Sequence, residues 1–289
     1  MAFDPSPLTL ACADGCRIDA SRYCGGERAA VLVAPALGVP RRFYEPFARF
    51  LAGRGYDVLT IDYRGTNGSG QGCDVAAIRL ADWARLDLGA ALHYLWSESK
   101  APRRVLVGHS LGGQLPGLAA ESEGLSAMVL IGASCPYPPL YPLIPRLRML
   151  LLWRVLVPWL SRGRSHFPAR RIGFSSIDIP AGAMRDWARW GLSRNYLFDP
   201  AHGLDTARYA GLKLPLLAYS FADDDYAVRP AVDALLAHYS SACIERRHIG
   251  RPIDGSRIGH FGYFSAKMRD NLWLHTADWL DRNISVMEL

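Results

Sequence analysis

One five-residue turn constrains this chain more than any other stretch: positions 108–112 read GHSLG and follow directly on the apolar run 105–107. That run is typical of a buried strand, and the residues from Gln114 to Glu121 are permissive for a helix. Between strand and helix, the pattern G-x-S-x-G makes a sharp turn that holds its serine strained and accessible, while the glycines allow close backbone approach. The sequence therefore predicts a nucleophile at Ser110, with the N–H of Leu111 placed to stabilise a developing negative charge.

Two other interpretations of this turn are weaker. Glycine-rich turns after strands are common, so the five residues alone have a chance explanation, but the flanking strand and helix patterns favour the nucleophile. A phosphate-binding loop is disfavoured, because no Gly-Lys-Ser/Thr follows and the glycine spacing does not fit G-x-G-x-x-G.

The composition describes a chain that can bury a sizeable core, since 50% of its 289 residues are hydrophobic. This length fits one α/β unit that carries an insertion. The formal net charge is +6, yet only three of the 33 basic residues are lysines, namely Lys100, Lys213 and Lys267. An arginine-rich, lysine-poor composition does not by itself indicate nucleic-acid binding, so we expect no nucleic-acid partner.

Six cysteines are scattered along the chain without a C-x-x-C pair or a histidine at metal-ligand spacing: Cys12, Cys16, Cys24, Cys73, Cys135 and Cys243. We therefore expect reduced thiols, no metal site and no cofactor. Residues 1–14 lack the positive and apolar regions of a signal peptide, and no apolar stretch predicts a transmembrane segment. These features predict a cytoplasmic protein.

Along the chain, buried strands alternate with helical patterns. Residues 8–24 predict a hairpin around Asp14-Gly15; strands are expected at 30–35, 57–62, 127–132, 214–221 and 243–248, and helices at 43–51, 76–96 and 266–281. This alternation favours a mostly parallel sheet covered on both faces. The rhythm breaks over residues 135–213, which are rich in proline and aromatic residues and contain no clear strand. We interpret 1–134 and 214–289 as the core and 135–213 as an inserted helical cap.

Several segments resemble the α/β-hydrolase family over nearly the whole chain outside the cap. They are the turn 108–112, Asp62-Tyr63-Arg64-Gly65, and the histidine loop Arg257-Ile258-Gly259-His260-Phe261-Gly262. The segments 34–40, 186–190 and 219–224 are similar to bacterial predicted hydrolases grouped beside serine aminopeptidases and monoacylglycerol lipases. The resemblance implies an α/β-hydrolase fold with an eight-stranded, mostly parallel sheet. The chain departs from the family pattern at Ala34-Pro35, where His-Gly is common, and at Val228, where proline is common.

Acyl transfer through a serine requires a base within reach of the hydroxyl and a carboxylate that orients the base. The family supplies them in the chain order Ser, Asp/Glu, His, which Ser110, Asp224 and His260 follow. Asp223 stays an alternative acid, and a solvated turn of aspartates is the non-functional alternative. The second oxyanion donor is the backbone N–H of either Ala36 or Leu37.

The cap has an unusual charge pattern. Between Gly124 and Ile177 there is no Asp or Glu, whereas seven arginines occur among apolar and aromatic residues: Arg146, Arg148, Arg154, Arg162, Arg164, Arg170 and Arg171. One interpretation is an apolar face packed on the core with solvated arginines. The other is a lid that binds an acyl chain carried on an anionic group, with Arg162, Arg164, Trp153 and Trp159 as substrate-binding residues.

The function that these residues predict is a serine hydrolase that cleaves a carboxylic ester or thioester, with an amide as a further option, through an acyl-serine intermediate. The expected partner is a small acyl substrate, free or linked to coenzyme A or a carrier protein. An acyltransferase with the same triad is the first alternative, and a non-catalytic binding protein on the same fold is the second. The sequence leaves the oligomeric state open.

Overall fold

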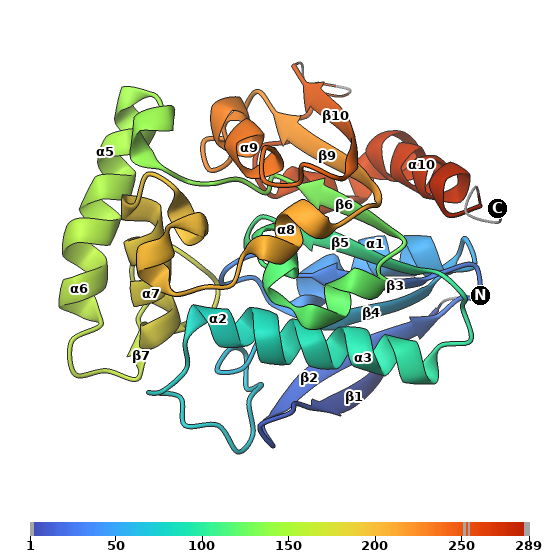
Figure 1. Cartoon of the computed structure of the whole chain (residues 1–289), viewed down its shortest axis with the longest axis horizontal. Helices are drawn as coiled ribbons and strands as arrows, with labels where there is room; N and C mark the ends of the chain where they lie inside the picture. The colour runs from blue at the N-terminus through green and yellow to red at the C-terminus, as the bar shows by residue number, and fades with distance from the viewer. Residues whose placement is uncertain (1–2, 251–252, 254, 286–289) are drawn as a thin grey trace.

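The computed structural model of the chain describes residues 3–250, 253 and 255–285, and its centre is an eight-stranded sheet (Figure 1). The strands lie in the order β1-β2-β4-β3-β5-β6-β9-β10. In the chain they are β1 (Ser6–Ala11), β2 (Arg17–Cys24), β3 (Ala30–Ala34), β4 (Asp57–Ile61), β5 (Arg104–His109), β6 (Ala127–Ile131), β9 (Pro215–Phe221) and β10 (Cys243–Ile249). Strand β2 runs antiparallel to β1 and β4, and all other neighbours are parallel. The predicted mostly parallel sheet is confirmed.

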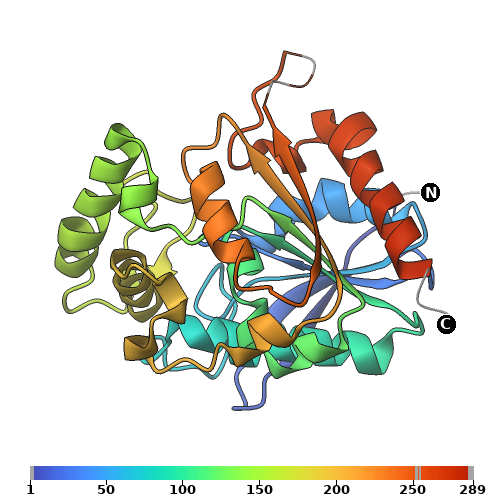
Figure 2. The same ribbon diagram turned by 45° about the horizontal axis from the view of Figure 1, so that its top comes forward.

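Helices cover both faces of this sheet. Helices α1 (Glu45–Ala52) and α10 (Leu274–Ser285) contribute to one buried cluster, and α3 (Gly89–Glu98) and α9 (Arg229–Leu236) contribute to the other. In Figure 2, α10 and α3 lie on opposite sides of the sheet. The period-two alternation of a strand explains the two cores: along β3, Leu32 belongs to the α3 cluster, whereas Val31 and Val33 belong to the α10 cluster.

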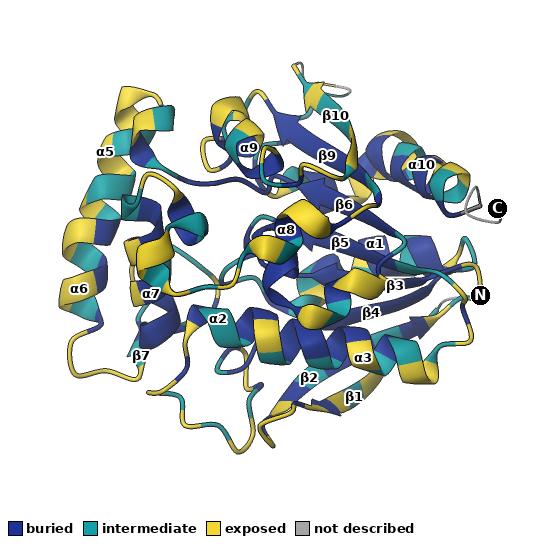
Figure 3. Ribbon diagram, in the orientation of Figure 1, coloured by how far each residue is buried: buried dark blue, intermediate teal, exposed yellow. Residues whose placement is uncertain are grey.

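The inner strands are buried throughout. Every residue of β3, β4 and β6 is buried, as Figure 3 shows for the middle of the sheet. Strands that are covered on both faces need continuous apolar runs instead of alternating ones, and this is the pattern from which the sequence predicted them.

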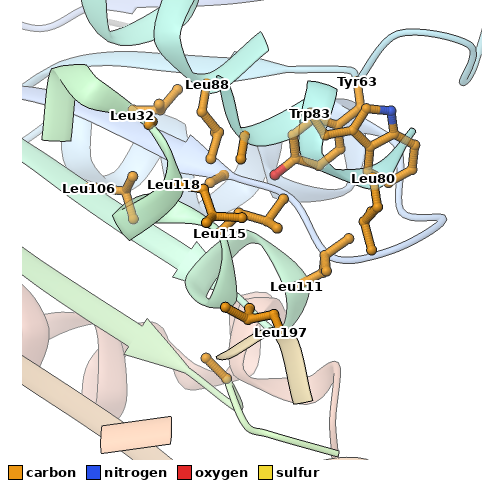
Figure 4. Packing of buried hydrophobic residues seen from close by; sticks show 14 of the residues in the cluster. Leu32, Tyr63, Leu80, Trp83, Leu88, Leu106, Leu111, Leu115, Leu118 and Leu197 are labelled. Atoms are coloured by element: carbon orange, nitrogen blue, oxygen red, sulfur yellow. The ribbon is translucent and has the colours of Figure 1, made fainter. Parts of the chain in front are cut away.

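The segment after the elbow differs from the prediction. The helix expected over Gln114–Glu121 is replaced by the short α4 (Leu111–Gln114) and two 3-10 turns, Pro116–Leu118 and Ala120–Gly124. Pro116 has no N–H to continue the helix, and the turn lets Gly117 lie against the ring of Tyr209 with no room for a Cβ. The apolar residues are still buried: Leu111, Leu115 and Leu118 belong to the same cluster as Leu32 and Leu106, and Figure 4 shows their side chains within it.

The helix predicted over 76–96 begins later and ends later. It consists of α2 (Leu80–Asp82), a π-helical turn (Trp83–Leu88) and α3, which ends at Glu98. The hairpin predicted around Asp14-Gly15 is formed by β1 and β2.

One disulfide corrects the expectation that all cysteines are reduced. Cys16 and Cys73 are bonded, with their Cα atoms 5.3 Å apart and 57 positions separating them in the chain. Backbone pairing of Arg17 with Gln71 brings the loop after β4 beside the start of β2, which a sequence separation of this size conceals. The remaining cysteines are free, Cys12 and Cys135 buried and Cys24 and Cys243 exposed.

Residues 135–213, hereafter the cap segment, connect β6 to β9. Their elements are α5 (Leu143–Leu151), a π-helical turn (Leu152–Leu156), α6 (Val157–Leu160), α7 (Ala181–Leu192) and α8 (Ala207–Gly211). The first part of the segment, as far as α7, lies to one side of the sheet, and α8 returns to the core beside the turn Pro116–Leu118 (Figures 1 and 2). A two-stranded ribbon, β7 (His166–Phe167) and β8 (Ile179–Pro180), adds short strands that the sequence did not predict. Three of these elements follow each other without a break, so residues 143–160 form one helix, hereafter the outer helix.

Candidate active site

Ser110 lies at the sharp turn between β5 and α4, at the carboxyl end of a central strand. Its backbone adopts φ 50° and ψ −115°, a conformation that is strained for a residue with a side chain. The turn is possible because bare backbone lies against it: a Cβ added to Gly112 would overlap the carbonyl of Ala34 at the end of β3. The local geometry is thus the strained elbow that the sequence predicts for a nucleophilic serine.

His260 and Asp224 meet beside this turn. Nδ1 of His260 lies 2.8 Å from Oδ2 of Asp224, whose side chain is completely buried. The other carboxylate oxygen, Oδ1, accepts the N–H groups of Tyr226 at 2.8 Å and Ala227 at 3.0 Å. The carboxylate thus occupies Nδ1 of the imidazole, and His260 lines the same cavity as Ser110.

Gly132, at the end of β6, makes room for this pair. Its φ is 57°, and a Cβ at this position would lie 3.3 Å from both Oδ2 of Asp224 and Nδ1 of His260. A side chain would therefore be strained by the backbone and would press on both partners.

The three consecutive aspartates have three different environments. Asp223 accepts the N–H groups of Ile258 and Gly259, each at 2.9 Å, and so holds the histidine loop in place. Asp224 contacts the imidazole, whereas Asp225 is exposed and borders a neighbouring cavity. The carboxylate that touches His260 is therefore Asp224, and Asp223 supports the same loop through its backbone.

The two backbone groups considered for the second oxyanion donor are not equivalent. The N–H of Ala36 already donates to the hydroxyl of Tyr44 at 2.8 Å. Within the described residues, no acceptor is recorded for the N–H of Leu37 or for that of Leu111. Both leucines line the cavity that contains Ser110. Leu37 and Leu111 are therefore residues of this cavity whose backbone N–H groups have no recorded acceptor among the described residues.

The sequence model of the alpha/beta hydrolase family matches residues 31–264, most of the chain. The chain belongs to this family. Solved structures agree with this α/β-hydrolase fold: an esterase from Pyrococcus furiosus has a TM-score of 0.66 at 17% identity, over 98% of this chain and 92% of the esterase. A soluble variant of the monoglyceride lipase from Saccharomyces cerevisiae, in complex with a substrate analogue, has a TM-score of 0.69 at 15% identity, over 97% and 95%.

An esterase from Exiguobacterium antarcticum has a TM-score of 0.62 at 14% identity, over 94% of this α/β-hydrolase and 98% of that esterase. At such identities the likeness concerns the fold. No curated protein sequence matches the chain.

A hydrogen-bonded relay, which the sequence did not predict, joins three loops of the α/β-hydrolase site. The hydroxyl of Tyr44 accepts from Ala36 and lies 2.9 Å from Nδ1 of His109, and Nε2 of His109 lies 2.8 Å from the carbonyl oxygen of His260. Since a carbonyl only accepts, Nε2 carries the hydrogen and Nδ1 accepts from Tyr44. Complete burial holds the pKa of His109 well below its usual value, and the nearby His260 lowers it further, so the ring is neutral.

The sequence has no signal for this contact, because Tyr44 and His109 are 65 residues apart. The relay connects the loop after β3, the elbow and the histidine loop.

Two adjoining cavities lie under the cap segment. The first, of about 60 Å³, contains Ser110 and His260. The second, of about 210 Å³, is lined mainly by apolar side chains of the outer helix and α7, among them Met149, Leu152, Trp153 and Trp187. The cavities share Pro136, Phe174, Trp187 and Tyr226 in their walls.

Of the four predicted substrate-binding residues, one lines a cavity and three are exposed on the surface. Trp153 is buried and lines the second cavity. Trp159 is 72% exposed, and Arg162 and Arg164 are exposed as well; none of the three lines either cavity.

Among the described residues, no three His, Cys, Asp or Glu side chains gather as a metal ion would require. None of the described helices combines the length and apolar composition needed to cross a bilayer.

Proposed function

We propose that this α/β-hydrolase is a serine esterase with Ser110 as nucleophile, His260 as base and Asp224 as the orienting acid. The observation that carries the proposal is the 2.8 Å contact between His260 Nδ1 and Asp224 Oδ2 beside a strained Ser110 in one cavity. A buried carboxylate that fixes the imidazole tautomer, and a serine raised on an elbow, are the parts that acyl transfer needs.

In the proposed first half-reaction, Nε2 of His260 takes the proton of the Ser110 hydroxyl while Oγ attacks the ester carbonyl. The negative charge that develops on the carbonyl oxygen accepts hydrogen bonds from the N–H groups of Leu37 and Leu111. Asp224 stabilises the imidazolium that forms. Collapse of the tetrahedral intermediate breaks the ester bond, and His260 gives its proton to the departing alcohol, which leaves the acyl group on Ser110.

In the second half-reaction, His260 takes a proton from water, and the resulting hydroxide attacks the acyl-serine in the same oxyanion site. The carboxylic acid departs as Ser110 recovers its proton from His260. The second cavity, with its apolar walls, would hold the acyl chain beside the reacting carbonyl.

An ester is the proposed substrate class because the structural relatives from Pyrococcus furiosus and Exiguobacterium antarcticum are esterases. A thioester, an acyl group carried on coenzyme A or a carrier protein, and transfer to an acceptor other than water are alternatives that use the same acyl-serine. A cytoplasmic location stays a prediction, and the Cys16–Cys73 bond weighs against it, because disulfides persist mainly in oxidising compartments.

Intact-protein mass after exposure to a fluorophosphonate tests the proposal. We expect one adduct on the native chain, none on Ser110→Ala, and one on Ser134→Ala, which removes the other serine of the same cavity. An adduct that persists in Ser110→Ala, or no adduct on a folded native chain, would contradict the proposed nucleophile. Release of p-nitrophenol from acyl esters then measures formation of the acyl-serine. The acyl product formed with and without added alcohols, amines or thiols separates hydrolysis, which gives the free acid, from acyl transfer, which gives a new ester, amide or thioester.

A further inference from the structure

The outer helix exposes large apolar residues on its solvent-facing side, where polar residues are usual. Its solvent-facing side carries six large apolar residues that are between 51% and 72% exposed: Leu143, Ile144, Leu147, Leu151, Val155 and Trp159. Five of them recur at intervals of four and therefore form one stripe along the helix. Figure 3 shows this helix at the edge of the molecule with much of its surface exposed. Solvent-facing helix surfaces are normally polar, so the stripe, hereafter the docking face, requires an explanation.

The inner side of the same helix is already packed. Trp153 is buried, with its ring centre 5.0 Å from that of Trp187 and its indole against Gly191. Val157 is buried as well, and Arg146 donates to the carbonyls of Pro138 and Tyr141 near the beginning of the helix. The docking face is thus not a core surface that a small rotation of the helix would bury.

Exposed arginines border the docking face. Arg148 and Arg154 lie on the helix, and Arg162 and Arg164 lie on the turn that follows it; all four are exposed. No ion-pair partner is recorded for any of them within the described residues. Positions 125–177 contain no Asp or Glu, so the outer helix and the turn after it supply no acidic partner of their own. Asp225, from the loop after β9, lines the second cavity together with Arg148, on the inner side of the helix.

We propose that the docking face binds the surface of an anionic phospholipid bilayer. The outer helix is about 27 Å long at 1.5 Å per residue, and it lies along the surface instead of crossing it. Its leucines and Trp159 enter the boundary between headgroups and acyl chains, while the arginines contact lipid phosphates. An exposed tryptophan suits this boundary, since its ring is apolar and its N–H remains a hydrogen-bond donor.

The charges argue against a second copy of the chain as the occupant. In a symmetric dimer each docking face would meet its own counterpart, which brings two sets of four unpaired arginines together. Like charges at an interface without acidic partners repel, whereas lipid phosphates neutralise them. The proposal concerns attachment alone and does not rest on which bond the enzyme cleaves.

Vesicle flotation tests the proposal on the full chain. The probes are vesicles of equal parts phosphatidylcholine and phosphatidylglycerol, compared with phosphatidylcholine alone. We expect the native chain to bind the anionic vesicles and to be released by high salt. Leu151→Ser/Trp159→Ser should reduce the partition coefficient at least about tenfold, since both apolar anchors are lost. Arg162→Gln/Arg164→Gln should also reduce it about tenfold or more, at about fivefold for each basic residue.

Matched controls lie outside the docking face. Ile244→Ser removes another exposed apolar residue, on β10, and Arg17→Gln/Arg282→Gln removes two other exposed arginines; both variants should bind as the native chain does. Circular dichroism verifies that every variant is folded. As a second readout, tryptophan emission should shift to shorter wavelength when anionic vesicles are added, and Trp159→Phe should abolish most of this shift.

Several results would overturn the proposal. They are no binding of the native chain to anionic vesicles, equal binding of the docking-face variants, or equal binding to neutral and anionic vesicles. A salt-independent dimer that Leu151→Ser/Trp159→Ser dissociates would assign the face to a second copy instead.

Discussion

The hydroxyl oxygen of Tyr44 lies 2.9 Å from Nδ1 of His109 and at the same time accepts the N–H of Ala36. The hydroxyl of Tyr44 therefore occupies the N–H of Ala36, the alternative to that of Leu37 in the proposed oxyanion site. It also donates to Nδ1 of His109, the residue that precedes Ser110 in the chain. Through His109 the same arrangement reaches the backbone of His260. Tyr44 is a positioning residue, because it aligns three loops without lining the Ser110 cavity.

Removal of this hydroxyl should slow the reaction more than it weakens substrate binding. In Tyr44→Phe the buried amide of Ala36 and Nδ1 of His109 both lose their partner, so the loops that carry Leu37 and His260 lose alignment. We expect kcat for an acyl ester to fall about tenfold with little change in KM. Tyr56→Phe, which removes a buried phenol bonded to Asp281 far from the site, should leave kcat unchanged. Equal kcat values for the two variants would contradict the positioning role.

Substitution of Asp224 should lower kcat far more than substitution of its neighbour Asp223. Asp224→Asn removes the acceptor that holds the imidazole tautomer, and kcat should fall by about 10³ to 10⁴. Asp223→Asn keeps one acceptor for the two backbone amides of the histidine loop, and kcat should fall only a few-fold. Steady-state kinetics on one ester measure both. If Asp223→Asn were the more damaged variant, the assignment of the acid would be wrong.

The second cavity should set the preferred acyl length. In the native enzyme, kcat/KM should rise about threefold for each added methylene until the cavity is filled. Met149→Trp places a larger side chain in that cavity. The kcat/KM for esters of long acids should therefore fall at least about tenfold, while that for acetate esters should change little. Leu147→Trp, on the exposed side of the same helix, is the control and should keep the native profile. A flat response of Met149→Trp to chain length would exclude this cavity as the acyl site.

Stability should decrease in mild acid partly because of His109. Its pKa in the folded chain lies well below the ordinary value of 6.5, since burial and His260 oppose the charge. Above pH 6.5 the ring is neutral in both states and costs nothing, whereas below pH 6.5 only the unfolded chain takes up the proton. The free energy of unfolding should therefore fall with decreasing pH, by up to about 1.4 kcal/mol per unit from this residue.

Urea unfolding at several pH values, compared between the native chain and His109→Gln, measures this contribution. His109→Gln should reduce the fall in the free energy of unfolding below pH 6.5. His93→Gln, at an exposed position, should not. Part of the slope will remain, because the pKa values of His202, His238, His248 and His275 are also lowered by burial. An unchanged acid limb in His109→Gln would refute the assignment.

The number of cysteines that can be alkylated tests the Cys16–Cys73 disulfide. Alkylation of the denatured, unreduced chain should label four cysteines, and prior reduction should raise the number to six. Cys16→Ser/Cys73→Ser should lower the free energy of unfolding by about 2–4 kcal/mol, because the bond no longer restricts the unfolded chain. Cys24→Ser/Cys243→Ser, which changes two exposed free thiols, is the control. Six labels without reduction would show that the bond is absent.

The sheet was predictable because its inner strands are buried on both faces. Runs such as 30–34 and 127–131 are apolar at every position, and their length between turn residues is that of a strand and too short for a typical helix. The helix after the elbow was not predictable with the same rule. Pro116 changes the local backbone while Leu115 and Leu118 keep their burial, so the apolar spacing survives where the helix does not.

In the candidate site, the strained turn at Ser110 was predictable, because a fixed residue pattern is required there. The contact that occupies the N–H of Ala36 was not predictable, since it depends on the hydroxyl of Tyr44. The Cys16–Cys73 bond depends on a pairing between β2 and a distant loop, which no local pattern encodes.

Gly132 illustrates how closely the backbone approaches the candidate site. With φ at 57°, and with Oδ2 of Asp224 and Nδ1 of His260 each 3.3 Å from where a Cβ would stand, a side chain here would strain the backbone and press on both partners. Substitutions then accumulate more readily in the cap segment, which supplies most of the wall of the second cavity. Turnover chemistry and substrate range can therefore diverge at different evolutionary rates within one chain.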